Sequence, residues 1–328
     1  MSDKDSVAAI SVIIPVYNDA RNLDRCLNHL FLSAFDDFEC IVIDDGSTDD
    51  SAAVARCHDV KLIQISNSGP AAARNHGVRK AGGRILFFID ADVLCHQDTL
   101  EKVYQAFQRD NVDAVFGSYD DEPAHNGMVS QFKNLYHHFT HQTAREEAHT
   151  FWAGCGAVRR EVFLNMDGFN TKYRKPMIED IELGYRLTKA GYSIRLVKAL
   201  QVKHLKKWTL IQLIKTDVFQ RGIPWTVLML QNRRFQNDLN VSKGQRLCVS
   251  LVFSLVLLFF LPPLCGLFYA FFVILAVILF NLKLYRFFLN KRGMVFSIKA
   301  LFLHLLYYLY SGISFLIGNV QYHILRRH

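Results

Sequence analysis

The chain has 328 residues, of which 51% are hydrophobic and 21% are charged, and its formal net charge is +8. This composition is too apolar for a disordered chain. The seven cysteines include no Cys-x-x-Cys pair, which excludes a zinc ribbon and a disulfide framework. The polar N-terminus lacks the apolar core of a secretory signal, so we expect the N-terminal part to lie in the cytosol.

The first part of the chain alternates short apolar runs with helical patterns. Strands are predicted at 10–16, 38–43, 61–65 and 84–89, and helices at 22–32, from 51 onward and at 70–81. Continuous apolar strands separated by helices predict an α/β fold with a mostly parallel, twisted sheet covered on both faces. In such sheets ligands bind beyond the carboxyl ends of the strands.

A polar cluster follows each of these four strands. Each cluster alone is also compatible with a capped turn. The clusters begin at Pro15, Asp44, Asn67 and Asp90. Carboxylates such as Asp44 or Asp45 accept hydrogen bonds from a base or a ribose, and Arg74 suits a base or a diphosphate. Asp90 and Asp92 are a hard oxygen pair of the type that holds Mg²⁺ or Mn²⁺. Together the clusters predict a nucleotide site beside a metal.

The set of motifs resembles glycosyltransferase family 2 with the GT-A fold. The matching segments are Val-Ile-Ile-Pro-Val-Tyr-Asn, Ile-Asp-Asp-Gly-Ser-Thr-Asp, Gly-Pro-Ala-Ala-Ala-Arg-Asn-His-Gly and Phe-Ile-Asp-Ala-Asp, within residues 9–205. The resemblance implies a nucleotide-diphosphate sugar donor (a UDP-sugar first), Mn²⁺ or Mg²⁺ as the cofactor, and inversion at the anomeric carbon. It assigns to the donor Pro15, Tyr17, Asn18, Asp44, Asp45, Gly69, Arg74, Asp90 and Ala91, and to the metal Asp92 and Asp90.

Two later segments resemble the acceptor half of the family. The first implies acceptor-side roles for Trp152, Gly154, Cys155 and Gly156, although it also reads as a core strand entering a helix. The second, Ile-Glu-Asp-Ile-Glu-Leu, implies that Asp180 is the base that takes the proton of an acceptor hydroxyl, with Glu179 as the alternative. Two acids at a helix N-terminus also have a purely structural reading. His204 follows a strand predicted at 193–202, and it either completes the metal shell or lies on the surface.

The C-terminal part is predicted to lie in a membrane. No charged residue occurs from Leu247 to Leu282, and one straight helix of that length would extend about 54 Å, against a hydrocarbon core of about 30 Å. Pro262 and Pro263 therefore separate two spans, 247–261 and 264–282, and a third is expected at 300–320. The basic loop before the third span is then cytosolic and the C-terminal tail lies outside. A single kinked pass in place of the hairpin is the alternative.

The predicted organisation has three parts. Residues 1–205 form the GT-A domain, 206–246 form an amphipathic membrane-interface segment, and 247–328 form the transmembrane region. A basic solvated linker is the alternative for the middle segment. The expected location is the cytoplasmic (inner) membrane, with the catalytic domain in the cytosol. The basic residues gather beside the spans, which argues against a nucleic-acid partner.

The resulting hypothesis is an inverting glycosyltransferase with a lipid or lipid-linked saccharide acceptor, acting in cell-surface polysaccharide or glycolipid biosynthesis. Its acceptor group is a hydroxyl. A polyprenyl-phosphate glycosyltransferase and a processive polysaccharide synthase are the alternatives. Residues 220–225 resemble the Gln-x-x-Arg-Trp motif of such synthases, but Arg221 is misplaced, which favours a single transfer. A nucleotidyltransferase and a sugar-nucleotide-binding scaffold without turnover are alternatives from other classes.

Overall fold

The computed structural model describes residues 8–109, 111–232, 243–260 and 262–326. The chain divides into two compact units. The first unit runs to Ala124 and resumes over His141–Lys206, and the second comprises His125–Thr140 and Lys207 onward. The segment 125–140 therefore leaves the first unit and belongs to the second, although it lies between two strands of the sheet in sequence.

In the described part of the first unit, the strands form one mixed sheet in the order β3-β2-β1-β4-β8-β6-β9-β5, with β7 paired to β9. The strands are β1 (Ile10–Val16), β2 (Phe38–Asp44), β3 (Lys61–Gln64), β4 (Ile85–Ile89), β5 (Val93–Cys95), β6 (Ala114–Tyr119), β7 (Glu147–Ala148), β8 (Cys155–Arg159) and β9 (Ile194–His204). The first four strands are parallel, as predicted. Strand β8 runs antiparallel to both β4 and β6, so the sheet is mixed rather than mostly parallel.

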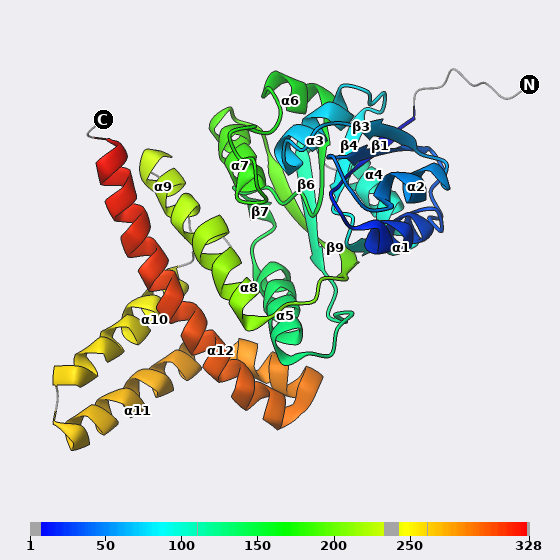
Figure 1. Cartoon of the computed structure of the whole chain (residues 1–328). Helices are drawn as coiled ribbons and strands as arrows, with labels where there is room; N and C mark the ends of the chain where they lie inside the picture. Colours follow the sequence, from blue (N-terminus) through cyan, green and yellow to red (C-terminus); the bar gives the residue numbers. More distant parts are fainter. Residues whose placement is uncertain (1–7, 110, 233–242, 261, 327–328) are drawn as a thin grey trace, which may run out of the picture. The chain divides into compact units, whose positions relative to one another are not determined.

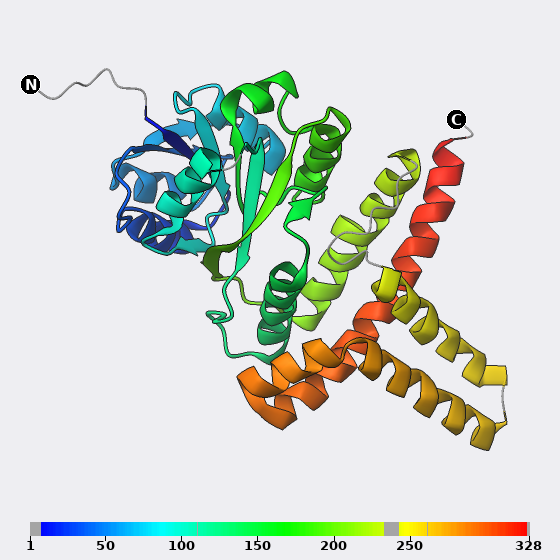
Figure 2. The same ribbon diagram turned by 180° about the vertical axis from the view of Figure 1, so that it is seen from behind.

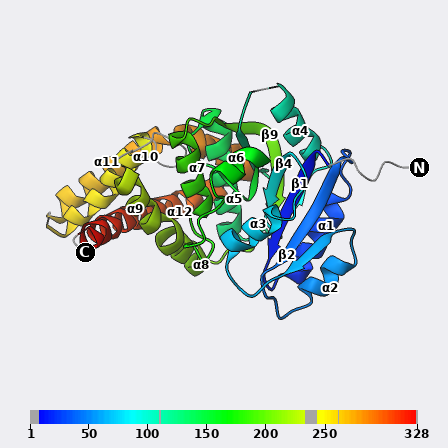
Figure 3. The same cartoon turned by 90° about the horizontal axis from the view of Figure 1, so that it is seen from above.

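Helices cover both faces of the sheet (Figure 3). One face carries α1 (Ala20–Leu30), α2 (Ser51–Arg56) and α4 (Thr99–Arg109), and the other carries α3 (Pro70–Val78), α6 (Arg160–Asn165) and α7 (Glu179–Lys189). Successive side chains of a strand point to opposite faces, so Ile13 packs in one core and Ile14 in the other. This two-sided burial explains the continuous apolar runs of β1 and β4.

One edge of the sheet gathers the predicted site. The parallel strands β1, β2 and β4 all end there. Because β8 is antiparallel to β4, it begins at that edge, and Cys155 pairs with Ile89. Strand β5 follows Asp92 directly, and its first residue, Val93, pairs with His204 at the end of β9. Segments far apart in the sequence are thereby brought to one side of the sheet.

The second unit is helical (Figures 1 and 2). It contains residues 128–140 of α5 (Met128–Thr143) together with α8 (Leu210–Lys215), the π-helical segment η1 (Thr216–Gly222), α9 (Ile223–Asn232), α10 (Lys243–Phe253), the 3₁₀ segment η3 (Ser254–Phe260), α11 (Pro263–Phe280) and α12 (Leu282–Leu325). Helices α10 and α11 lie side by side, and α9 runs alongside the C-terminal half of α12. Non-helical backbone at Gly293 kinks α12.

Two helices in the described residues, α11 and α12, are long and apolar enough to cross a membrane by length and composition. Helix α11 coincides with the predicted span 264–282 to within two residues and exposes large side chains such as Phe268 and Phe272. The predicted span 247–261 lies in α10 and η3 up to Phe260, and its last residue, Leu261, lies outside the described residues. In the predicted interface segment 206–246, Arg233 and Arg234 also lie outside the described residues.

Candidate active site

The loops that follow β1 and β2 are joined by side-chain hydrogen bonds. Asn18 adopts a left-handed backbone conformation with φ 52°. Its side-chain oxygen accepts a hydrogen bond from the backbone N–H of Thr48 at 2.7 Å, and its own N–H donates to the Ser47 hydroxyl at 2.9 Å. Asn18 therefore fixes the loop, while the neighbouring Tyr17 ring is 53% exposed at the site edge. Pro15 is half-buried within β1.

Asp44 and Asp45 are both buried, and both stabilise the loops around them. Asp45 accepts hydrogen bonds from the backbone N–H groups of Ser68 and Gly69, at 2.7 and 2.8 Å. Asp44 accepts one from the N–H of Ser47 at 2.9 Å. Each carboxylate oxygen has more than one acceptor position, so these contacts leave acceptor capacity for a ligand.

Gly69 allows a close approach between two parts of the chain. Its φ is +90°, and a Cβ added there would lie 2.2 Å from the carbonyl oxygen of Arg174. A side chain at this position would therefore meet backbone and a strained conformation at once. The loop around Arg174, which makes this close approach, lies just before α7 in the sequence.

Arg74 connects the donor-side and acceptor-side carboxylates. Its side chain is 5% exposed, and its guanidinium lies 2.6 Å from Asp90 and 3.1 Å from Glu179. Burial works to lower the pKa of Arg74, but the two carboxylates hold it above its ordinary value. The Phe169 ring lies under the guanidinium, 5.6 Å from ring centre to Cζ. Arg74 was predicted to bind a base or a diphosphate, and here it binds these two carboxylates.

The two acids at the start of α7 have different surroundings. Glu179 accepts hydrogen bonds on both oxygens, from Arg74 and from the N–H of Met177. Asp180 accepts hydrogen bonds from two backbone N–H groups, those of Ala153 at 3.1 Å and Ile181 at 2.8 Å. Burial, with the nearby Glu179 charge, raises the pKa of Asp180 to about 6. A carboxyl with this pKa is ionised near pH 7 and is suited to accept a proton.

Asp92 and His204 meet where β4 ends and β9 ends. Asp92 Oδ2 lies 3.5 Å from His204 Nε2. Burial works to raise the pKa of Asp92, but the imidazole holds it below its ordinary value. The Tyr119 ring stacks on the imidazole with 4.1 Å between ring centres and 7° between planes. Ala91, between the two aspartates, is buried, and Asp90 points to Arg74 instead.

These donors fit a divalent metal that takes its other ligands from a bound diphosphate. A carboxylate oxygen and an imidazole nitrogen suit Mn²⁺, and the carboxylate alone suits Mg²⁺. Within the described residues, no group of three or more His, Cys, Asp and Glu side chains gathers as a complete cage. Asp92 and His204 are thus two close donors and not a complete cage. Asp90 was predicted as a further ligand, but its ion pair with Arg74 occupies one of its oxygens.

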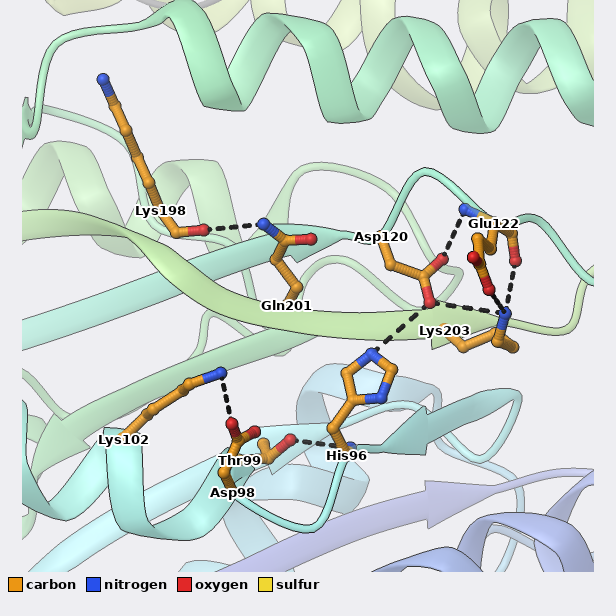
Figure 4. A network of polar contacts seen from close by, with 9 residues as sticks. All are labelled: His96, Asp98, Thr99, Lys102, Asp120, Glu122, Lys198, Gln201 and Lys203. Carbon is orange, nitrogen blue, oxygen red and sulfur yellow. Dashed lines mark hydrogen bonds and ion pairs between the residues drawn. The ribbon is translucent and has the colours of Figure 1, made fainter. Parts of the chain in front are cut away.

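A polar network holds the end of β9 next to this site (Figure 4). Asp120, just after β6, lies 3.5 Å from Lys203 Nζ and 3.5 Å from His96 Nε2. Lys203 also donates to the backbone carbonyl of Glu122 at 2.7 Å. Lys203 immediately precedes His204, so the network fixes the backbone from which the imidazole projects.

The predicted acceptor-side segment lies at the start of β8. Trp152 makes edge-to-face contacts with Tyr119 at 4.8 Å and His141 at 5.6 Å. A Cβ added at Gly154 would meet the Trp152 ring, so this glycine allows the indole to lie against the strand. One added at Gly156 would meet the backbone carbonyl oxygen of Trp152. Cys155, which was predicted on the acceptor side, is fully buried in the sheet core.

Two aromatic side chains of the site were not singled out from the sequence. Tyr119 is the last residue of β6 and lies at the same edge of the sheet as Ile89 and His204. Acidic residues follow it, so β6 is a fifth strand that is followed by a polar cluster. That strand-end position was the available signal. Phe169 lies in a loop far in sequence from Arg74, and no sequence signal marks their contact.

Comparisons with known proteins show what the sequence resembles. Residues 11–166 match the model of glycosyl transferase family 2, and residues 133–208 match the N-terminal domain of galactosyltransferase. Glycosyltransferase GlyG of Streptococcus pneumoniae is 31% identical over 139 residues, which are 40% of this chain and 44% of that protein. Glycosyltransferase AglE of Haloferax volcanii is 33% identical over 145 residues, covering 42% and 47%. The chain thus spans less than half the length of these relatives.

Solved structures share the fold at low sequence identity. The mannosyltransferase PcManGT from Pyrobaculum calidifontis, in complex with GDP-Man and Mn²⁺, is 18% identical and aligns over 97% of this chain and 88% of its own, with a TM-score of 0.51. S. aureus TarS in complex with UDP-GlcNAc is 20% identical and aligns over 67% and 64%, also with a TM-score of 0.51.

Proposed function

We propose that the chain, which matches the glycosyl transferase family 2 model over residues 11–166 and shares the GT-A fold, transfers a sugar from a nucleotide-diphosphate donor, with inversion, to a hydroxyl of a lipid or lipid-linked saccharide. The observation that carries the proposal is the Asp180 carboxylate. It is fixed by two backbone amides, and its pKa is raised to about 6. A hydroxyl nucleophile needs such a base, because it must lose its proton as it attacks.

The donor occupies the edge of the sheet in this proposal. The exposed Tyr17 ring faces the base, and Asp44 and Asp45 offer acceptor positions to the base or ribose. We favour a UDP-sugar, as the sequence resemblance implies, and the solved structures of this fold bind UDP-GlcNAc or GDP-Man. Asp92 and His204 would hold Mn²⁺ or Mg²⁺. When bound, the metal neutralises negative charge on the leaving diphosphate.

Asp180 and Glu179 divide the work in the proposed reaction. Asp180 takes the acceptor proton, while the sugar carbon changes its bond from the diphosphate oxygen to the acceptor oxygen. Glu179 keeps the guanidinium of Arg74 in place through their ion pair at 3.1 Å. Arg74 in turn orients Asp90 beside the donor. This arrangement favours Asp180 over Glu179 as the base, because both oxygens of Glu179 are already engaged.

A membrane location supports the choice of a lipid acceptor. Helix α11 presents several exposed large apolar side chains, and the uncharged stretch from Leu247 to Leu282 is suited to hydrocarbon. Attachment at the cytoplasmic face of the inner membrane would hold the catalytic unit near its acceptor. Basic residues of the interface segment, such as Lys206, Lys207 and Lys215, would contact anionic headgroups.

Nucleoside diphosphate release by the detergent-purified full-length chain tests the proposal. The assay uses UDP-, GDP- and dTDP-sugars with Mn²⁺, with and without a lipid extract of the source membrane. We expect release from one donor, stimulation by the extract, and loss in Asp92→Ala but not in the control Asp98→Ala, whose partner is the surface residue Lys102. Release of pyrophosphate would indicate a nucleotidyltransferase, and donor binding without release would indicate a scaffold.

A further inference from the structure

A layer of polar side chains crosses the second unit near the middle of the predicted third span. Asp217 of η1 lies 2.7 Å from Lys133 Nζ and accepts a hydrogen bond from the Tyr310 hydroxyl at 2.7 Å. Next to this group, Gln245 at the start of α10 accepts one from the Tyr308 hydroxyl at 2.6 Å. Tyr308 and Tyr310 of α12 therefore contact an amide group of α10 and a carboxylate of η1.

Lys133 and Asp217 form a largely buried ion pair. The two side chains are 15% and 7% exposed. Burial works to raise the pKa of Asp217, but Lys133 holds it below its ordinary value. If residues 300–320 crossed the bilayer, Tyr310 and this ion pair would lie at its centre, where charged groups are costly. Tyrosine and charged side chains are favoured instead at the membrane–water interface, which places this layer there.

The α10–α11 hairpin begins and ends at the same polar layer. Gln245 donates to Asn281 Oδ1 at 3.1 Å, and Asn281 is the residue that follows α11. Lys243 and Arg246 flank Gln245 at the start of α10. Beyond these residues the hairpin is uncharged, and the 18 residues of α11 extend about 27 Å, close to the thickness of the hydrocarbon core.

Helix α9 packs along the C-terminal half of α12. A Cβ added at Gly318 would lie 2.6 Å from Thr226, and one at Gly222 would lie 2.7 Å from Ser314, so α9 and η1 follow the C-terminal half of α12 closely. The sequence then continues through residues 233–242, which include Arg233, Arg234 and Asp238, to α10 at the polar layer. Because α9 packs against this half of α12, the two helices share one environment, either the bilayer or its interface.

We therefore infer that the chain enters the bilayer only through the α10–α11 hairpin, and that α9 and the C-terminal half of α12 lie along the membrane interface on the side from which the hairpin enters. The partner of their exposed apolar face is the lipid surface. That face presents Ile313, Leu316, Ile317, Val320 and Ile324, at helical spacing. The inference rests on the membrane attachment in the proposed function. It replaces the third span and the outside C-terminus expected from the sequence.

Labelling with a membrane-impermeant maleimide in sealed vesicles of both orientations tests the inference. Among the described residues, two native cysteines are exposed: Cys57 in the first unit and Cys265 near the turn of the hairpin. Cys265→Ser keeps Cys57 as the marker of the catalytic side. Gln321→Cys, in the Cys57→Ser and Cys265→Ser background, reports the end of α12, where position 321 is exposed.

We expect Gln321→Cys to be labelled in the same vesicle orientation as Cys57. Labelling in the opposite orientation would overturn the inference, and so would labelling that requires detergent, because the end of α12 would then cross or enter the bilayer. Nucleoside diphosphate release by the same vesicles reports the proposed function separately. Turnover together with opposite labelling would overturn the topology alone, whereas recovery of the wild-type chain in the soluble fraction would overturn the topology and the membrane attachment together.

Discussion

The guanidinium of Arg74 donates a hydrogen bond to the Glu179 carboxylate across 3.1 Å, and this ion pair joins α3 to the first turn of α7. The same guanidinium binds Asp90 at the end of β4. One buried cation therefore relates the donor-side motif to the acceptor-side motif. Because the Asp90 and Glu179 carboxylates depend on one arginine, the end of β4 and the start of α7 are held in a fixed relation.

Replacement of Arg74 by Met is expected to lower both stability and turnover. The substitution leaves the buried Glu179 carboxylate without its cation, which in comparable cases costs about 3–5 kcal/mol. Asp90 is partly exposed, so we expect the lower end of that range. The exposed Arg79→Met, at the end of the same helix, is the control and should change stability by less than about 0.5 kcal/mol. Thermal unfolding of the detergent-purified chain compares the stability of the two variants. Equal melting temperatures of Arg74→Met and Arg79→Met would contradict the ion-pair role of Arg74.

The pH dependence of turnover is expected to report Asp180. Its pKa is raised to about 6, and a base works only when ionised, so kcat/KM should rise as the pH increases through about 6 and then level off. Asp180→Asn should lower kcat by about 10²–10⁴-fold and remove this rise. Asp98→Asn, the same change on the surface, is the control. Near-normal turnover in Asp180→Asn would instead favour a phosphate acceptor, which is already ionised and needs no base.

The strands and the site edge were predictable because their signals are local. The run at 10–16 is apolar at nearly every position since β1 is buried on both faces, and the acids at 179 and 180 begin α7 as expected. The pairing of Arg74 with Glu179 could not be predicted, because it depends on the tertiary fold. The reversed direction of β8 has the same origin. The sequence also gives no sign that residues 125–140 leave the first unit. Phe132, Leu135 and Tyr136 form an apolar helix face, and such a face is equally suited to pack against the sheet.

The requirement for metal is expected to depend on His204. In His204→Ala, Asp92 is left as the single close donor of the pair, so the Mn²⁺ concentration for half-maximal release should rise about ten-fold or more. Nucleoside diphosphate release by His204→Ala should largely recover at saturating Mn²⁺. Such recovery distinguishes a metal ligand from a residue with a general structural role. His58→Ala, whose ring pairs with the exposed Asp24, is the control. An unchanged Mn²⁺ dependence in His204→Ala would place the imidazole outside the metal site.

Lys133→Met is expected to destabilise the second unit more than a paired replacement does. The single change leaves the Asp217 charge buried without its ammonium partner, which costs about 3–5 kcal/mol in comparable sites. Lys133→Met combined with Asp217→Leu removes both charges, so most of that loss should be recovered. The exposed Lys215→Met, on the neighbouring turn of helix, is the control.

Thermal unfolding of the full-length chain in detergent compares these variants. A double variant as unstable as Lys133→Met would mean that the apolar pair cannot replace the packing of the ion pair, or that Tyr310 loses a necessary acceptor at Asp217. The variant Tyr310→Phe separates these two explanations, because it removes only the hydroxyl. If Tyr310→Phe is stable while the double variant is not, then the packing around Asp217, rather than its hydrogen bond to α12, holds η1 in place.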